Sequence, residues 1–390
     1  MIVEMSTRRD FLGGLGAAGL VGLYGGRAFG QEAPKPAAAT PDVAKAIAFL
    51  RSRQEPAGSW SGQREPGITA LVVAGLLRSK RVGPDDPAIV KALGFLEGYL
   101  LPKDGKKVPH SVYATSVGLM AFHEANASGK YDAVVKEAQG FLRNAQYDEG
   151  EGKGRDDPQY GGLGYGDGRS RPDMSNTSFM IEALRDSGVP ADDPALQKAL
   201  IFVSRCQNLK SEFNDQPFAD KVNDGGFIYT SGEVAPPPGR AGRGREAEAE
   251  KARVEAKAER EELNGGIRSS GSMTYSGFKS MIYAGLKPDD QRVKAAIGYI
   301  RKNYTVDENP GQGKRGLYYY YMVFARAMAA LGEDPFVAAD GKSHDWKAEL
   351  AAALAARQEP SGAWANADDR FMEGDPAIAT SFALLALAAK

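Results

Sequence analysis

The sequence has very little cysteine and histidine and no excess of charge of either sign. Of its 390 residues, one is cysteine and three are histidine. Because Cys206 is alone, no disulfide can form within the chain, and a structural zinc site built from cysteines is not expected. Lys and Arg number 49 and Asp and Glu number 50, which gives a net charge of -1. That balance disfavours a general nucleic-acid-binding protein and a polybasic membrane protein.

A convincing membrane-spanning run is also missing near the N-terminus, where the sequence instead resembles a targeting signal. Arg8 and Arg9 precede an uncharged segment, residues 11–26, that contains many glycines. This segment is too short and too weakly apolar for a membrane span, which needs about 20 predominantly apolar residues. Twin arginines before such a segment resemble a Tat export signal. We therefore expect a periplasmic or cell-envelope protein whose mature form has no transmembrane domain.

From residue 42 onward, one motif is repeated six times. Each repeat begins with a segment that has apolar residues at helical spacing, and several of these segments open with Asp-Pro, which is typical of a helix start. The six predicted first helices are 42–53, 87–100, 133–145, 194–206, 291–304 and 346–357. A polar, glycine-rich turn then leads into a second, more apolar helix.

The second helices share a threonine that is followed seven residues later by a large apolar residue. The pairs are Thr69/Leu76, Thr115/Phe122, Thr177/Leu184, Thr274/Met281 and Thr380/Leu387, with Tyr321/Met328 in the fifth repeat. Seven residues are about two helical turns, so both members of a pair lie on one face. This pattern predicts outer helices that face water and inner helices that are buried all round. The last helix, residues 376–389, is almost wholly apolar, and a closed ring would bury it by packing repeat six against repeat one.

Two turns, one in the first repeat and one in the last, have the same pattern Gln-x-x-x-Gly-x-Trp. The glutamine amide can satisfy free backbone groups at a helix end, the glycine permits a tight reversal, and the tryptophan holds the turn against its neighbour. We interpret these residues as structural: Gln54, Gly58, Trp60, Gln358, Gly362 and Trp364.

Such turns on helix pairs of this length resemble the prenyltransferase/squalene-cyclase repeat superfamily. The resemblance covers roughly residues 42–390, and the segments 161–165 and 224–229 echo the turn weakly. It implies an all-α fold, a closed (α/α)6 toroid of six helical hairpins around a central cavity.

The catalytic groups of that superfamily are missing from this sequence. Its class II terpene cyclases protonate the substrate with the middle aspartate of Asp-x-Asp-Asp-Thr, two residues before the threonine. The residues found at that position here are Gly67, Tyr113, Ser175, Ser272, Tyr319 and Ile378. Its protein prenyltransferases hold zinc with Asp, Cys and His, whereas His110 and His123 would not share a helix face. We therefore expect no metal and no cofactor.

Candidate site residues are those near the starts of the inner helices, which surround one mouth of the cavity in the resembled fold. The candidate catalytic residues are Asp173, Asn176 and Asp375, and the candidate ligand-binding residues are His110, Tyr113, Tyr275, Tyr319, Tyr320 and Asp224. Aromatic walls suit an isoprenoid chain, a carbocation or a sugar. Tyrosines also commonly fill the interior of a ring, and Asp173 and Asp375 are equally typical of helix N-caps.

Three functional hypotheses follow from these features. The leading one is a protein that binds, or modifies, an apolar or isoprenoid-like small molecule or lipid. The second is a carbohydrate-active lyase or hydrolase that uses two carboxyl groups from Asp157, Asp173, Asp224 and Asp369. The third is a non-catalytic interaction scaffold.

The expected domain organisation has three parts, the last of which contains an insertion. Residues 1–30 form the signal peptide, residues 31–41 a flexible lead-in, and residues 42–390 the toroid. The toroid is interrupted by residues 233–264, a proline-rich and then charged stretch that we interpret as a flexible insertion able to dock a protein partner.

Overall fold

The fold is mainly α-helical, as the sequence predicts. The computed structural model describes residues 39–60, 65–100, 111–166, 170–231, 254 and 256–389, which belong to one structural unit. The predicted signal peptide, most of the predicted lead-in, His110 and most of the predicted insertion lie outside the described residues. Within the insertion, residues 256–262 are helical.

The first helix of each repeat exposes one side and buries the other. These helices are α1 (Val43–Ser52), α3 (Pro87–Leu100), α5 (Asp132–Asn144), α7 (Pro194–Arg205), α10 (Gln291–Lys302) and α12 (Trp346–Ala355). Aspartates cap several of them; for example, the side chain of Asp193 accepts a hydrogen bond from Ala195 N at 2.9 Å. The buried residues of α5 are Val134, Ala138 and Leu142, which recur every four residues and form one face.

The second helix of each repeat is buried on nearly all sides. These helices are α2 (Pro66–Arg78), α4 (Ser111–Glu124), α6 (Met174–Asp186), α9 (Gly271–Tyr283), α11 (Leu317–Leu331) and α13 (Pro376–Leu387). Every residue of α2 is buried, as are residues 377–386 of α13. Within the described part of the chain, no helix combines the length and the apolarity needed to cross a membrane.

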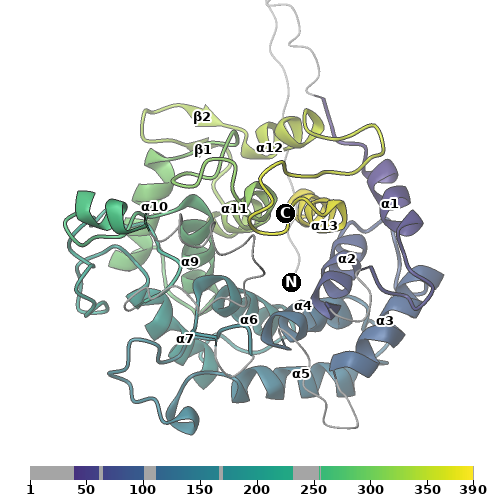
Figure 1. Cartoon of the computed structure of the whole chain (residues 1–390), viewed down its shortest axis with the longest axis horizontal. Helices are drawn as coiled ribbons and strands as arrows, with labels where there is room; N and C mark the ends of the chain where they lie inside the picture. The colour runs from purple at the N-terminus through teal and green to yellow at the C-terminus, as the bar shows by residue number, and fades with distance from the viewer. Residues whose placement is uncertain are drawn as a thin grey trace, which may run out of the picture. The chain divides into compact units, whose positions relative to one another are not determined.

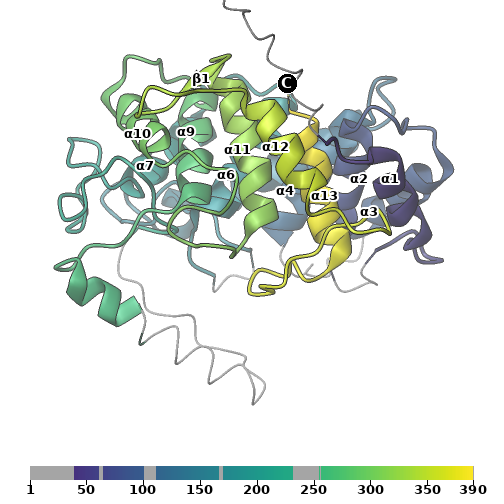
Figure 2. The same cartoon turned by 90° about the horizontal axis from the view of Figure 1, so that it is seen from above.

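The second helices contact one another in a cyclic order (Figures 1 and 2). Helix α2 contacts α4, α4 contacts α6, α6 contacts α9, α9 contacts α11, α11 contacts α13, and α13 contacts α2. The first helices pack on the outer side of this group, as α5 does against α4 and α10 against α9. The apolar α13 is therefore covered by α11 and α2.

The repeated threonine accepts a hydrogen bond from the turn that precedes its helix. The backbone N–H groups of Trp60, Leu163, Phe227 and Trp364 donate to Oγ1 of Thr69, Thr177, Thr274 and Thr380, over 3.0 to 3.1 Å. Each donor is the second residue after the glycine of its turn. The threonine thus provides a partner for a buried N–H group that would otherwise be left unpaired.

A glutamine amide joins each of these turns to the start of a first helix in another repeat. Each amide nitrogen donates two hydrogen bonds, one to the glycine carbonyl of its own turn and one to a carbonyl at the start of a first helix. In order, the glutamines are Gln54, Gln146, Gln207 and Gln358, the glycines are Gly58, Gly161, Gly225 and Gly362, and the second acceptors are Ala88, Ala195, Arg292 and Asp42. The eight distances range from 2.7 to 3.1 Å. Sequence analysis identified only Gln54 and Gln358, because 15 and 18 residues separate Gln146 and Gln207 from their glycines.

The glycine of each turn permits a close approach between backbones. Gly58 has φ +96° and Gly362 has φ +89°, both in the left-handed region. A Cβ atom on Gly58 would lie 2.7 Å from Lys91 O, and one on Gly362 would lie 2.5 Å from the carbonyl carbon of Lys45. The turns of the first and last repeats therefore pack directly on α3 and α1.

The tryptophans tie each of these two turns to the first helix of its own repeat. The indole Nε1 of Trp60 donates to Leu50 O at 2.6 Å, and that of Trp364 donates to Leu354 O at 2.8 Å. Both indoles are buried. Each tryptophan therefore holds its turn against the helix that precedes it.

The regular structure also includes elements that the sequence did not predict. The strands β1 (Phe336–Val337) and β2 (Ser343–His344) form a short antiparallel pair before α12. The 3-10 helix η2 (Glu149–Glu151) lies in the long turn of the third repeat.

Candidate functional site

Chemically distinct side chains occupy one face of the second helices. This face is formed by four positions, counted from the repeated threonine. They are the residue two before it and the residues two, five and nine after it, which are at helical spacing. At the start of the helices these positions include Tyr113, Phe179 and Phe382, whereas near the ends they include Arg78 and Glu182. An aromatic region and a charged region therefore lie toward opposite ends of the second helices.

Asp173 is the central residue of the aromatic region. We define the Asp173 cluster as Asp173, Asn176, Tyr165, Tyr229 and Tyr319. Asp173 is only 2% exposed and caps α6, where its Oδ1 accepts a hydrogen bond from Asn176 N at 2.8 Å. Its Oδ2 accepts a second bond from Asn176 Nδ2, also at 2.8 Å. The backbone N–H of Met174 donates to Tyr229 O at 2.8 Å, which joins the start of α6 to the turn of the fourth repeat.

The burial of this cluster changes its proton affinities. Burial raises the pKa of Asp173 to about 6, although hydrogen bonds from Asn176 and Tyr229 act in the opposite direction. Burial, together with the negative charge of Asp173, raises the pKa of Tyr165 to about 12 and that of Tyr229 well above its ordinary value. The side chains of Tyr165 and Tyr229 are nevertheless 37% and 40% exposed. The carboxyl group therefore changes protonation near neutral pH, beside phenols that remain hydrogen-bond donors.

Aromatic rings from several second helices adjoin the cluster. The ring of Tyr113 meets that of Phe179 edge to face, with centroids 5.3 Å apart. The ring of Tyr319 lies 6.0 Å from Phe179 and 5.8 Å from Phe382. The predicted residues Asp173, Asn176, Tyr113 and Tyr319 thus belong to one region of the structure.

A buried glutamate that sequence analysis did not identify positions Tyr319. Helix α11 has Gly316 at its N-cap and no capping side chain of its own. Instead, Oε1 of Glu373 accepts from Tyr319 N at 2.7 Å, and its Oε2 accepts from Tyr318 N at 3.2 Å and from Asn366 Nδ2 at 2.8 Å. Burial raises the pKa of Glu373, although these hydrogen bonds oppose the rise.

Two predicted tyrosines lie in the packing between α9 and α11. Tyr275 and Tyr320 are buried, and their ring centroids are 5.6 Å apart. The hydroxyl of Tyr320 donates to Thr305 O at 2.7 Å. Their surroundings are those of core residues.

The remaining predicted aspartates are separate from Asp173. Asp224 is exposed and accepts hydrogen bonds from Gly226 N at 2.9 Å and Ser269 Oγ at 2.7 Å, which shape the turn of the fourth repeat. Asp375 caps α13 by accepting from Ala377 N at 2.8 Å. It also lines a cavity of about 310 Å³ near Trp60.

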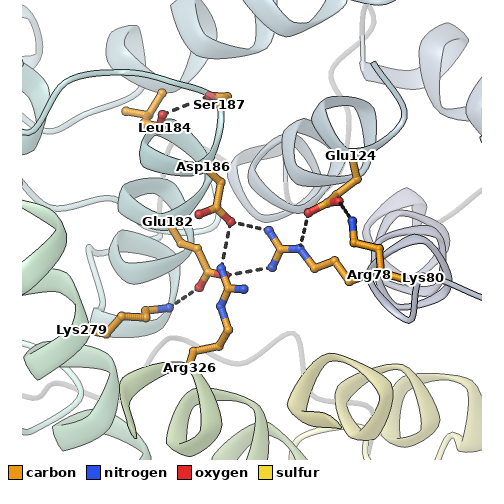
Figure 3. Close-up of polar contacts among 9 residues, drawn as sticks. All are labelled: Arg78, Lys80, Glu124, Glu182, Leu184, Asp186, Ser187, Lys279 and Arg326. Carbon is orange, nitrogen blue, oxygen red and sulfur yellow. Dashed lines mark hydrogen bonds and ion pairs between the residues drawn. The ribbon is translucent and has the colours of Figure 1, made fainter. Parts of the chain in front are cut away.

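The charged region gathers side chains from five second helices (Figure 3). We define the charged cluster as Arg78, Lys80, Glu124, Glu182, Asp186, Lys279 and Arg326. The guanidinium of Arg78 pairs with Glu124 at 3.2 Å and Glu182 at 3.1 Å, and also with Asp186. Nη2 of Arg326 lies 2.7 Å from Glu182 and 2.9 Å from Asp186.

Glu182 is the shared anion of this cluster. It is buried and also pairs with the buried Lys279. Burial by itself would raise the pKa of Glu182, but the charges of Arg326, Lys279 and Arg78 outweigh that effect and hold the pKa well below its ordinary value. Glu182 is therefore ionised in the folded protein.

A cavity of about 390 Å³ lies beside the charged cluster. Its walls include Arg78, Lys80, Arg326 and Glu124, together with Tyr283. Alanines from α11 and from the residues after α13 complete the lining.

Sequence analysis missed the charged cluster, although a signal for it is present. The repeated position is the threonine of each second helix, or Tyr321 in the fifth repeat. The residues five positions after it include Glu182, Lys279 and Arg326, and those nine positions after it include Arg78, Glu124 and Asp186. Charged residues in register within helices that are otherwise apolar are a sign that these residues meet one another.

Neither a cluster of metal-binding side chains in the described residues nor a match to a known family was found. Within the described ranges, no group of three or more His, Cys, Asp or Glu side chains could hold a metal ion. The chain matches no known family in a comparison with protein-family models, and it matches no curated protein.

Proposed function

We propose that the Asp173 cluster binds an apolar, isoprenoid-like ligand that carries a hydroxyl group. The observation that carries this proposal is a buried carboxyl group with a pKa near neutrality, placed beside the partly exposed Tyr165 and Tyr229. The tyrosine rings offer apolar faces, and the carboxyl and phenol groups offer hydrogen bonds for one hydroxyl.

The acidity of Asp173 favours binding over cyclisation. Protonation of a carbon–carbon double bond requires an unusually strong acid, and a carboxyl group with a pKa of about 6 is weaker than an ordinary aspartate. The position that holds the acid in the resembled cyclases is occupied here by Ser175. We therefore propose ligand binding without chemistry at a double bond.

The acids considered for carbohydrate chemistry lend little support to that alternative. Asp157 pairs with Lys153 at 2.9 Å, and Asp369 accepts a hydrogen bond from Gly374 N at 2.9 Å. Both therefore have evident roles in shaping loops. A pair of carboxyl groups flanking a sugar is the requirement of that chemistry, and Asp173 has no such partner among its hydrogen bonds.

Calorimetric titration of the purified chain tests the proposal. Farnesol and geranylgeraniol are the probes, with hexadecane as an apolar comparison and maltohexaose as a carbohydrate comparison. We expect the two alcohols to bind, and Tyr229→Phe to weaken binding about tenfold by removing a hydrogen bond to the hydroxyl. Asp173→Asn should weaken binding about tenfold at pH values above about 6, because it replaces a charged acceptor with a neutral amide. Tyr320→Phe is the matched control, because it removes a phenol hydroxyl within the core packing, and it should leave the affinity unchanged. Failure of both alcohols to bind, or equal binding of hexadecane, would refute the proposal.

We infer that the cyclic order of helix contacts corresponds to a closed (α/α)6 toroid. The packing of α13 against α2 supports this inference, as do the hydrogen bonds between Gln358 and Asp42. Small-angle X-ray scattering tests it, since an open array of the same hairpins has a larger radius of gyration than a closed one.

We also propose that the protein is exported by the Tat pathway, on the basis of Arg8 and Arg9. Replacing both with lysine should leave the protein in the cytoplasm, whereas the unaltered chain should be recovered from the periplasm or cell envelope. An unchanged location in cell fractionation would contradict this proposal.

A further inference from the structure

We propose that the cavity beside the charged cluster is a second ligand site, and that it takes a small carboxylate with a short apolar tail. This site lies toward the opposite end of the second helices from the Asp173 cluster and is independent of the function proposed above.

The charges of the cluster leave a place for one more anion. Four cationic side chains, Arg78, Lys80, Lys279 and Arg326, meet three carboxylates, Glu124, Glu182 and Asp186. The difference is one positive charge within these described residues. The unbalanced charge is that of Lys80, whose side chain is 63% exposed, so an additional carboxylate would be held at the cavity wall by Lys80 and the guanidinium of Arg326.

The unused hydrogen-bond donors belong to side chains that line the cavity. All three guanidinium nitrogens of Arg78 contact carboxylates. By contrast, Nε of Arg326 is buried without a partner, and Figure 3 shows dashed lines at only one nitrogen of this guanidinium. Lys80 is 63% exposed and contacts Glu124 at 2.7 Å. The ion pairs that Arg326 makes within the described residues all use Nη2, so the rest of this guanidinium, which lines the cavity, has donor capacity left for an acceptor there.

The rest of the cavity wall determines the kind of anion. Ala329, Ala330, Ala388 and Ala389 line it together with Tyr283, and these small apolar side chains suit a short hydrocarbon chain. A planar carboxylate matches the edge of a guanidinium group and brings one negative charge. Phosphate brings more negative charge than the single excess cation can balance.

The experiment is a calorimetric titration of the full chain with sodium butyrate and hexanoate, and with butanol and inorganic phosphate as comparisons. We expect both carboxylates to bind, with affinity that falls as salt increases, and butanol and phosphate to bind at least about tenfold more weakly. Arg326→Lys keeps the charge but loses the guanidinium edge, so it should weaken carboxylate binding about tenfold.

Two surface variants keep the test informative even if Arg326→Lys perturbs the fold. Lys80→Gln alters an exposed side chain and should weaken binding about threefold. Lys136→Gln removes an exposed lysine on α5 and should have no effect. The proposal is overturned if phosphate or butanol binds as tightly as butyrate. It is also overturned if Lys80→Gln and Lys136→Gln have the same affinity for butyrate. Asp173→Asn should leave butyrate binding unchanged, so the two sites can fail separately.

Discussion

Gln358 and Asp42 exchange two hydrogen bonds although 316 residues separate them in the sequence. The backbone N–H of Asp42 donates to Gln358 Oε1 at 2.7 Å, and Gln358 Nε2 donates to Asp42 O at 2.9 Å. Gln54 contacts the carbonyl of Ala88 at the start of α3 in a similar way. The last repeat is thus joined to the first by the kind of contact that joins neighbouring repeats.

Gln358→Ala should therefore destabilise the protein about as much as Gln54→Ala. Gln358 makes two bonds to Asp42 and one to Gly362, and their loss is expected to lower the free energy of unfolding by about 2 kcal/mol. Urea unfolding of both variants measures the effect. If only Gln54→Ala is destabilising, the contact between the sixth and first repeats contributes nothing to stability.

Gly362→Ala tests the same junction through its backbone. Gly362 has φ +89° and would place a Cβ 2.5 Å from Lys45, whereas Gly188 has φ +92° and no neighbour within 4 Å. Gly188→Ala should therefore cost only the conformational strain, about 1 kcal/mol. Gly362→Ala should cost about 2 kcal/mol more because Lys45 must move. Equal losses in thermal or urea unfolding would mean that α1 does not pack against this turn.

Stability should decrease as pH rises through the range in which Asp173 loses its proton. Its pKa is about 6 in the folded protein and 3.8 for an ordinary aspartate, so between these values the folded state binds a proton that the unfolded chain releases. Asparagine is also a good N-cap, so Asp173→Asn should remove this dependence without losing the cap.

The stabilisation produced by Asp173→Asn should accordingly grow by about 2 kcal/mol between pH 4.5 and pH 7.5. Urea unfolding of the unaltered chain and the variant at both pH values provides the measurement. A difference that does not change with pH would show that the folded protein does not raise the pKa of Asp173.

Removal of the shared anion in the charged cluster should be strongly destabilising. Glu182→Gln leaves Lys279 and Arg326 buried with less compensation, and we expect a loss of about 3 to 5 kcal/mol. Adding Lys279→Met should recover part of that loss, because it removes the cation that depends most on Glu182. Urea unfolding of the single and double variants decides the matter, and a loss below about 1 kcal/mol in the single variant would contradict the description of Glu182 as an essential partner.

The helices were predictable because each repeat carries its own local signals. Aspartate caps, apolar spacing and the repeated threonine depend on neighbours in the sequence, and the predicted helices agree with the observed ones to within about two residues. The roles of Gln146 and Gln207 were not predictable from a fixed motif. Their partners lie beyond turns of variable length, so only the folded chain brings the amide and the glycine together.

The candidate site was predictable only in part. Asp173 and Tyr319 follow from their position at the starts of second helices. The burial that raises the pKa of Asp173 depends on tertiary structure, since the start of α6 is joined to Tyr229 in the turn of the fourth repeat. Glu373 lies in a loop with no distinctive pattern, and its contact with α11 depends on tertiary structure. Glu182 and Lys279 stand at the same position of their repeats, five residues after the repeated threonine, but their ion pair forms only when α6 and α9 pack together.

The contact of α13 with α2 affects where local unfolding of the domain can begin. In a linear array of hairpins, the terminal hairpins have one neighbour each and are the first to fray. Here the second helix of the last repeat is held between α11 and α2. Amide protons in α13 should then exchange with solvent as slowly as those in α6, and only when the whole domain unfolds.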